Sequence, residues 1–260
     1  MRNIVRLSLF CILLILASFS SLEPNQYKIK KVVINAGHGG KDPGTMGKFS
    51  KEKDVVLKVA LELESLIKKY LPDVEVVMTR RTDKYMELHQ IAAVANKSNA
   101  DLFISIHCNA NPNKKIVGSE TYVMGLTKSA GNLEVAKREN SVILMEDDHK
   151  TKYEGFDPNS TQSHILFSLY QNAFSQNSLN LAERIENQFK NRVGRISRGV
   201  KQAGFLVLWR TSMPSVLVEL GFLSNPQEER DLNDELKQTY FASAIFRAFR
   251  DYKEDLESMN

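Results

Sequence analysis

The sequence predicts an α/β domain of three layers, in which helices cover both faces of a central sheet of about six strands, mostly parallel or mixed. Two observations support this fold class. Apolar runs of strand length alternate along the chain with longer segments that have helical periodicity. Three of the apolar runs also end in or contain a polar residue, namely His38, His107 and Glu219. Polar side chains delivered to the edge of a buried sheet are typical of a functional site.

The first half of the chain is expected to hold strands and helices in alternation. The apolar run 30–35 predicts the first strand, and a glycine-rich loop follows it. The segment 52–70 predicts a helix, because apolar residues from Val56 to Ile67 recur at helical spacing. Further strands are expected at 75–79, 102–106 and 118–124, and a further helix at 86–98.

The second half begins with a segment, residues 129–177, that breaks this alternation. It starts with a helical pattern, passes through a charged stretch and a turn-rich piece, and then becomes helical again. We interpret it as a helical insertion on the sheet and not as a separate domain. After it we expect a helix at 178–192, strands at 205–208 and 215–219, and a final amphipathic helix whose apolar face carries Phe241, Ala244, Ile245, Ala248, Phe249 and Tyr252.

The first 20 residues have the features of a secretory signal peptide. Arg2 and Arg6 precede an uncharged apolar run, and the small residues Ser18 and Ser20 suit cleavage after Ser20. The run is shorter than the roughly 20 apolar residues that span a membrane, although an uncleaved anchor is the alternative. The predicted organisation is therefore a signal peptide at 1–20, a short linker at 21–29 and a catalytic domain at 30–260.

The remaining composition narrows the class of protein. Of the two cysteines, only Cys108 remains after the signal is removed, so no internal disulfide can form. The net charge of +4 includes Arg2 and Arg6, and what remains is too low for a nucleic-acid-binding protein. No later segment has transmembrane length, so no stable membrane insertion is expected after cleavage. We expect a secreted protein, and the insertion and the lack of a wall-anchoring module favour the periplasm over an open cell surface.

Two histidines have the sequence context of metal ligands. His38 follows a strand and precedes two glycines, which allow a sharp turn and a close approach of the backbone. His107 ends the most apolar strand, on the same face as Ser105 and Asn109. A histidine bonded within a turn is the alternative for His38. His89, His149 and His164 lack the strand-end context and are expected at the surface or in packing.

Two glutamates complete the candidate site. Glu52 begins a helix, where the helix dipole alone would favour a carboxylate, but catalytic zinc typically needs a third protein ligand. Glu219 interrupts an apolar strand and would be costly to bury without a partner. It could act as a general base toward an attacking water. The alternative for Glu219 is a buried ion pair with Arg210 or Arg80.

With these residues in place, the chain resembles the zinc-dependent N-acetylmuramoyl-L-alanine amidases of the type-3 family, the bacterial cell-wall amidases of cell separation. The matching pieces occur in family order over nearly the whole mature chain. They are VVINAGHGGKDPG, EKDVVLKVALEL, MTRRTD, the AN of AVANKSNADLFISIHCNA, GSETYVMG, GVKQAGFLVL and MPSVLVELGFLSNP. One departure is Ile91, which stands where the family commonly has an arginine.

The resemblance implies a zinc-hydrolase-like fold and one Zn²⁺ per chain, held by His38, Glu52 and His107, with Glu219 as the catalytic carboxylate. It implies peptidoglycan as the substrate, and hydrolysis of the amide between the lactyl group of N-acetylmuramic acid and L-alanine. Asn109 and Arg80 are candidates to bind substrate or to support the ligands.

The insertion 129–177 fits family members in which a helix covers the site until a division-associated activator removes it, with Glu139 as the candidate that would reach the zinc. Simple packing over the sheet, or widening of the substrate groove, is the alternative for this segment. For the whole protein three alternatives stay open: a zinc peptidase that cuts another stem-peptide bond, an inactive zinc-holding regulator that binds peptidoglycan, and a metal-free binding protein.

Overall fold

A mixed β-sheet forms the centre of the molecule in the computed structural model, which describes residues 28–169 and 173–258. The predicted signal peptide and most of the linker lie outside these residues. Within them the sheet has six strands in the order β2-β1-β3-β6-β4-β5. All neighbours are parallel except β4 and β6, which are antiparallel. The strands are β1 Lys31–Ala36, β2 Glu75–Met78, β3 Leu102–Asn109, β4 Ser119–Met124, β5 Ser197–Ala203 and β6 Ser215–Phe222.

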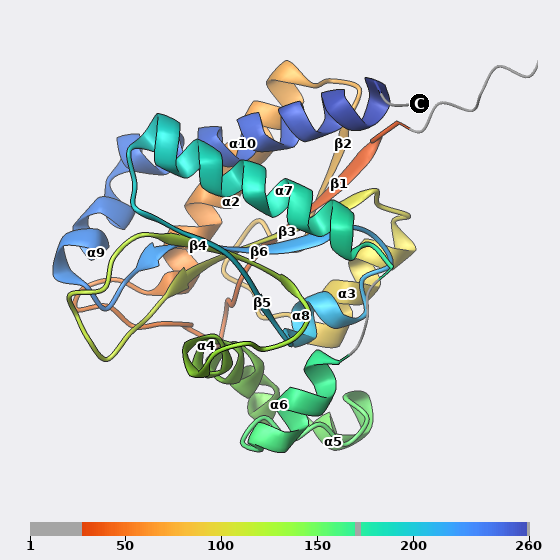
Figure 1. Cartoon of the computed structure of the whole chain (residues 1–260), viewed down its shortest axis with the longest axis vertical. Coiled ribbons are helices and arrows are strands. Elements are labelled where there is room, and N and C mark those ends of the chain that lie inside the picture. Colours follow the sequence, from red (N-terminus) through yellow and green to blue (C-terminus); the bar gives the residue numbers. More distant parts are fainter. Residues whose placement is uncertain (1–27, 170–172, 259–260) are drawn as a thin grey trace, which may run out of the picture.

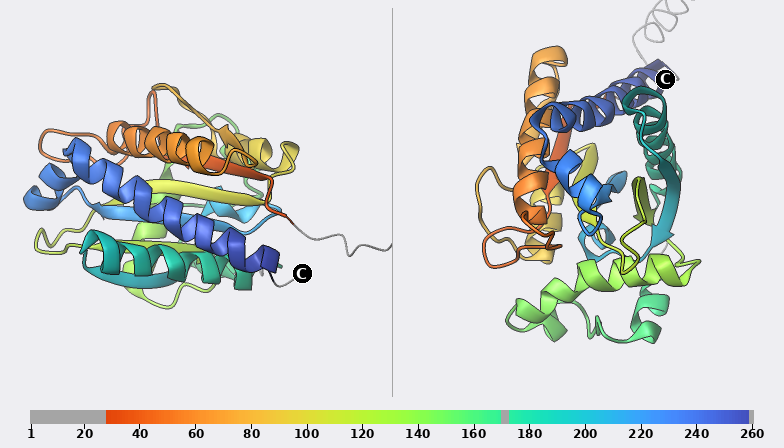
Figure 2. Two further views of the ribbon diagram at one scale, coloured as in Figure 1. Left: turned by 90° about the horizontal axis from the view of Figure 1, so that it is seen from above. Right: turned by 90° about the vertical axis from the view of Figure 1, so that its left-hand side faces the viewer.

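Helices cover both faces of this sheet, which confirms the predicted three-layer α/β class (Figure 1). Three long helices lie side by side over one face, as the view from above in Figure 2 shows. Apolar side chains of β1, β3 and β6, such as Ile34, Ile104 and Val218, pack against these helices and form the larger core. The helices are α2 Glu52–Tyr70, α7 Ser175–Gln188 and α10 Glu235–Ser258.

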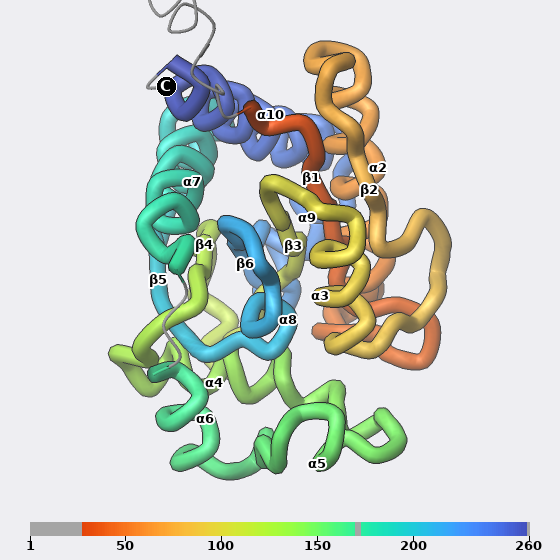
Figure 3. The backbone as a smooth tube through the Cα atoms, turned by 90° about the vertical axis from the view of Figure 1, so that its right-hand side faces the viewer, coloured from red at the N-terminus to blue at the C-terminus, as the bar shows by residue number. Residues whose placement is uncertain are grey.

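The opposite face carries a second core and a different set of helices. Phe103, Tyr122 and Leu217 point from the strands into this core, because alternate residues of a strand face opposite sides. Shorter elements cover them, and the segment that contains α5 and α6 gathers at the end of the molecule away from α7 and α10 (Figure 3). These elements are α3 Leu88–Lys97, α4 Ala130–Asn140, η1 Ser141–Met145, α5 His149–Lys152, α6 Thr161–Ser168 and α8 Leu206–Trp209.

The predicted insertion contributes directly to this second core. Residues of 129–177 that are buried there are Val135, Ala136, Val142, Ile143, Tyr153, Phe156 and Phe167. Two helices of the segment begin with a serine cap: Ser129 accepts from the Asn132 N–H, and Ser160 accepts from the Ser163 N–H. The segment is therefore packed on the sheet by its own apolar side chains.

One predicted strand is wrong. Residues 205–208 form the start of α8 and not a strand, although Phe205, Leu206 and Leu208 are buried as an apolar run would suggest. A short buried run has no periodicity that separates a strand from a helical turn. The strand that pairs with β4 is instead β5, at Ser197–Ala203, which is half-exposed and polar and was missed in the sequence.

Other boundaries differ by a few residues. β3 and β6 each extend three residues further than expected, so that His107 and Glu219 lie inside strands and not at their ends. The helix expected at 178–192 is α7 followed by a π-helical turn, η2 Phe189–Val193, and a short helix, α9 Pro226–Asn233, precedes α10. Among the described residues, no helix combines the length and the apolar character that a membrane span requires.

Candidate metal centre and active site

His38 lies in the loop after β1, in a backbone conformation that favours glycine. Its φ is +61°, which is uncommon for a residue with a side chain and indicates a position held by its surroundings. The Asp42 carboxylate lies 2.6 Å from His38 Nδ1, which leaves Nε2 free to face the site. Gly44 is needed nearby, because a Cβ there would lie 2.6 Å from both the His38 ring and Glu52 Oε2.

His107 comes from β3 on the same face of the sheet as Ser105. Its Nε2 lies 3.0 Å from Ser105 Oγ, which also accepts a hydrogen bond from Asn35 Nδ2. The Asn35 carbonyl oxygen in turn accepts from Thr79. This buried chain orients the ring so that Nδ1 points toward Glu52, and Gly37 leaves room for it, because a Cβ on Gly37 would overlap the ring.

Glu52 is fully buried at the first turn of α2, which packs beside β1 and β3. Its Oε1 accepts from the Cys108 N–H at 2.8 Å, and its Oε2 accepts from the Thr45 N–H at 2.7 Å. Oε1 also lies 3.0 Å from His38 Nε2 and 3.1 Å from His107 Nδ1. Two backbone donors thus hold this carboxylate between the two imidazoles.

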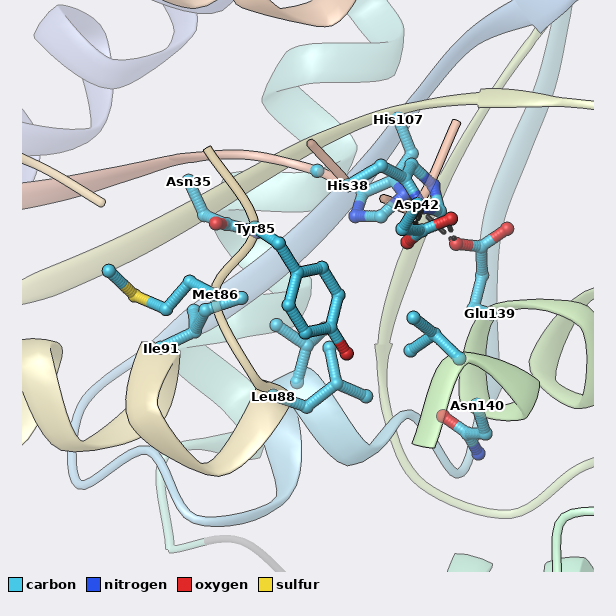
Figure 4. A pocket seen from close by; sticks show the side chains of 13 residues that line it. Asn35, His38, Asp42, Tyr85, Met86, Leu88, Ile91, His107, Glu139 and Asn140 are labelled. Carbon is cyan, nitrogen blue, oxygen red and sulfur yellow. Dashed lines mark hydrogen bonds and ion pairs between the residues drawn. The ribbon is translucent and has the colours of Figure 1, made fainter. Parts of the chain in front are cut away.

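Glu139 of α4 completes a group of four. Its side chain projects from the helix toward His38 and His107 (Figure 4), with Oε2 at 3.3 Å from His38 Nε2 and 3.0 Å from His107 Nδ1. One ligand atom from each of His38, Glu52, His107 and Glu139 lies within 4.8 Å of all the others. His38 Nε2 and Glu139 Oε2 are buried and lack a hydrogen-bond partner. Two imidazoles and two carboxylates around orphaned buried atoms fit a Zn²⁺ ion.

The charges of this group favour a cation at its centre. Burial alone opposes protonation of His107, but the charge of Glu139 and the close approach of the Glu139 and Glu52 carboxylates raise its pKa to about 9. His38 behaves in the same way: burial is outweighed by the Glu52 charge and by hydrogen bonds, so its pKa also rises. The pKa of Glu52 falls to about 2 despite its burial, because His38 lies beside it. A bound divalent cation would satisfy the same carboxylates without these protons.

Glu219 lies next to His107 across the β3–β6 pairing and is fully buried. Neither of its carboxylate oxygens has a hydrogen-bond partner, and its contact with a cation is with Arg138 Nη2 at 3.7 Å. Burial, reinforced by the charge of Glu139, raises its pKa well above the ordinary value. A carboxyl with a raised pKa beside a metal site can take and return a proton.

The expected alternative partners of Glu219 are engaged elsewhere. Arg210 pairs with Glu154. Arg80 is buried and donates to the backbone carbonyls of Ala36 and Gly37, so it supports the loop that carries His38 and does not face the metal group. The alternative of an ion pair between Glu219 and either arginine is therefore wrong for this structure.

Asn109 is the other candidate that the structure places near Glu219. Its amide nitrogen donates to Glu120 Oε2, and its amide oxygen accepts from Arg138 Nη2 at 3.0 Å.

The remaining histidines lie apart from the four-residue group. His164 packs against Phe156, and His89 lies beside Glu87 and Glu146 in a second cluster of candidate ligands whose Glu146 is held by Tyr85 and Tyr153.

The space in front of the histidines is small. A cavity of about 20 Å³ is lined by His38, His107, Glu139, Tyr85 and Val142, among others. This volume holds about one water molecule, not a sugar or a peptide. Val142 and Glu139 both belong to the segment 129–177, so that segment forms one wall of this cavity.

Some functional groups gave little signal in the sequence. Asp42, which fixes the His38 ring, could have been found as the carboxylate that ends the HGGKD piece. Arg138 and Asn140 flank Glu139 but have no distinctive spacing, and their roles depend on tertiary contacts. The fold and these groups define a class, namely a three-layer α/β domain with the residues of a metal-dependent hydrolase gathered at the carboxyl-terminal ends of central strands.

Comparison with known proteins gives the family. The family model for N-acetylmuramoyl-L-alanine amidase matches residues 32–251. Amidase AmiA of Escherichia coli K12 is 35% identical over 217 residues, which are 82% of this chain and 73% of AmiA. Amidase AmiC of Escherichia coli O6:H1 is 34% identical over 229 residues, 86% of this chain but 53% of AmiC. This chain thus spans about half the length of that relative.

A solved structure agrees with this assignment. The CwlD amidase of Clostridioides difficile, determined in complex with the GerS lipoprotein, matches with a TM-score of 0.64 and 27% identity, over 87% of this chain and 99% of that chain. The protein therefore belongs to the N-acetylmuramoyl-L-alanine amidase family, as the sequence motifs indicated, and is a cell-wall hydrolase of that class.

Proposed function

We propose that the protein is a zinc-dependent amidase that hydrolyses the bond between the lactyl group of N-acetylmuramic acid and L-alanine in peptidoglycan. The observation that carries this proposal is the convergence of His38, Glu52 and His107 beside the buried Glu219, whose carboxylate oxygens have no hydrogen-bond partner. The family membership supports the bond, and the ligand set supports the metal.

In the proposed reaction each residue has a distinct task. Zn²⁺, when bound, supplies Lewis-acid polarisation of the amide carbonyl and lowers the pKa of water. Asp42 and Ser105 hold the two imidazole rings in place. Glu219 accepts the proton of the attacking water and passes it to the nitrogen of the leaving L-alanine, and its raised pKa favours holding that proton between the two steps.

We further propose that the segment 129–177 keeps this site closed. Glu139 would occupy a fourth position at the metal, and Val142 leaves a cavity too small for substrate. An activator associated with cell division would then displace the segment, so that activity is limited to septal wall splitting in the periplasm. The solved complex of the CwlD amidase with the GerS lipoprotein supports this proposal, because it shows an amidase of this fold bound to another protein.

The first experiment is mass spectrometry of purified peptidoglycan digested by the mature protein with zinc, beside a Glu219→Ala control. Release of stem peptides with a free L-alanine amino group, lost in the control, is the expected result. Peptides cut at another bond would favour a zinc peptidase. If neither the intact protein nor an opened variant releases peptides, the chain is a binding protein or an inactive regulator.

The opened variant is Glu139→Ala, because deletion of 129–177 would strip seven buried apolar side chains from the second core. Lys137→Ala, on the same helix but with its amine directed to Thr161 and away from the site, is the matched control. Autoinhibition predicts faster release by Glu139→Ala and unchanged release by Lys137→Ala. Equal rates for both variants and the original chain would contradict it.

A further inference from the structure

Arg138 of α4 makes a set of contacts that the closure of the metal site by Glu139 does not require. Its Nη1 donates to the Ala110 carbonyl at 3.2 Å, and its Nη2 donates to Asn109 Oδ1 at 3.0 Å. Its Nε donates to the carboxylate of Glu139. The guanidinium also lies 3.7 Å from Glu219, so it fills the space beside the residue proposed to move the proton.

The two acceptors belong to the end of β3, directly after the candidate ligand His107. Ala110 is the first residue beyond the strand, and the hydrogen bond that its carbonyl receives from the described residues is the one from Arg138. Asn109 Oδ1 accepts from its neighbour, the Ala110 N–H, and from Arg138, while the amide nitrogen is fixed by Glu120. When α4 moves, the Ala110 carbonyl loses this donor and Asn109 Oδ1 loses one of its two, which is costly unless another donor takes the place of Arg138.

A hollow continues outward from this point. It measures about 480 Å³ and is lined by Ala110, Asn111 and Pro112 on one side and by Arg138, Val135 and Glu134 of α4 on the other. Its inner end is therefore the Arg138 side chain. A ligand that entered the metal site along this path would meet the Ala110 carbonyl and Asn109 Oδ1 in place of Arg138.

We propose that Asn109 Oδ1 and the Ala110 carbonyl form a binding subsite for backbone N–H groups of the stem peptide, and that Arg138 occupies this subsite as a stand-in for the substrate. The proposal rests on the proposed amidase function. It assigns the peptide side of the scissile bond to the hollow beside β3. In the closed state, Arg138 would then block the peptide subsite while Glu139 blocks the metal site.

The chemistry favours a peptide over a sugar as the occupant. Arg138 offers N–H donors and no acceptor, and it meets two carbonyl oxygens, the pairing that an extended peptide makes with a strand end. If the leaving nitrogen lies at Glu219, the next amide of the peptide follows about 3.6 Å further along the chain. One nitrogen, Arg138 Nη2, contacts both Glu219 and Asn109 Oδ1, so the proposed subsite is the immediate neighbour of Glu219.

The test uses the full mature chain with Arg138→Ala and, as the matched control, Lys137→Ala, which removes the adjacent cation that contacts Thr161 outside the site. Zinc-loaded protein digests peptidoglycan while a soluble N-acetylmuramoyl dipeptide competes. A second competitor is the same dipeptide with its second amide nitrogen methylated, so that one donor is lost without any change in the protein. The half-inhibiting concentration of each competitor is measured.

The subsite predicts that Arg138→Ala digests peptidoglycan at least about tenfold faster than the original chain and Lys137→Ala, and that methylation weakens competition by about tenfold, the effect of one hydrogen bond. Equal competition by the two dipeptides, or none by either, would overturn the subsite and leave Arg138 as a structural anchor. If no variant, Glu139→Ala included, released free L-alanine amino groups, the proposed function would fail first.

Discussion

Replacing Asn140 by alanine should loosen the closed segment without touching the metal group. Asn140 is almost fully buried and points away from the histidines (Figure 4). Its side-chain amide donates to the Gly204 carbonyl at 2.8 Å and accepts from the Leu206 N–H at 2.9 Å. These two hydrogen bonds fasten the end of α4 to the connection between β5 and α8.

The size of the effect follows from these bonds. Each buried hydrogen bond contributes about 1 kcal/mol, so Asn140→Ala should lower the free energy of local opening by about 2 kcal/mol. Such a change multiplies the open population by about 30. Hydrogen–deuterium exchange of the α4 and η1 amides measures this population directly, and exchange there should accelerate by the same factor.

Two further readouts keep this prediction specific. Amides of β3 should exchange as in the original chain, and peptidoglycan digestion should rise in proportion to the exchange of α4. Lys128→Gln, at an exposed position just before α4, should change neither rate. The reasoning is refuted if α4 exchanges no faster in Asn140→Ala, or if β3 accelerates equally, which would mean global destabilisation instead of local opening.

Three other predictions test the proposed general base, the metal site and the buried Glu120. Glu219→Gln should keep its zinc by elemental analysis but lose about 10²- to 10⁴-fold in kcat, the usual contribution of a general base, and unchanged turnover would contradict its role. Zinc at about 100 times its Kd should stabilise the protein by about 2.7 kcal/mol in thermal unfolding, and His107→Ala should abolish this gain. Burial opposes ionisation of Glu120, but Lys201 and Arg198, each 2.6 Å away, hold its pKa below the ordinary value. The ionised Glu120 therefore contributes its full stabilisation above the unfolded-state pKa, and this stabilisation is lost as the pH falls through the lower folded-state pKa. Below about pH 4.5, the Tm of Glu120→Gln should thus fall less steeply than the Tm of the original chain.

Hydrophobic pattern sufficed to predict most of the fold, and polar residues in apolar runs pointed to His38, His107 and Glu219. Glu52 was added as the carboxylate that begins a helix, and Glu139 followed only from the family resemblance. Val33 and Phe103 lie in strands whose apolar runs are buried on both faces, which is the strongest pattern a sequence can offer. His38 and His107 stood out because each follows such a run. The structure places them with ring centroids 4.9 Å apart.

The parts that failed depend on tertiary contacts. β5 carries charged residues, Arg198 and Lys201, among small and polar ones, because it is an edge strand and these two side chains hold Glu120. The apolar run that follows β5 in the sequence was mistaken for a strand. It is apolar because it forms α8, a helical turn whose side chains are buried in the second core. The contacts of Arg138 bring together residues 28 and 29 positions apart, and no local pattern encodes them.

The segment 129–177, which we propose closes the site, also completes the second core, and this packing would limit how the proposed closed state can open. Baring its seven buried apolar side chains would cost about 10 kcal/mol or more at about 1.5 kcal/mol each, so thermal motion alone almost never lifts the whole segment. Activation would therefore be one of two events. Either α4 and η1 move locally, or the whole segment is displaced and another protein buries the apolar surface that it exposes. In the second case the activator has to remain attached for as long as the enzyme works, and cutting of the wall ends when it departs.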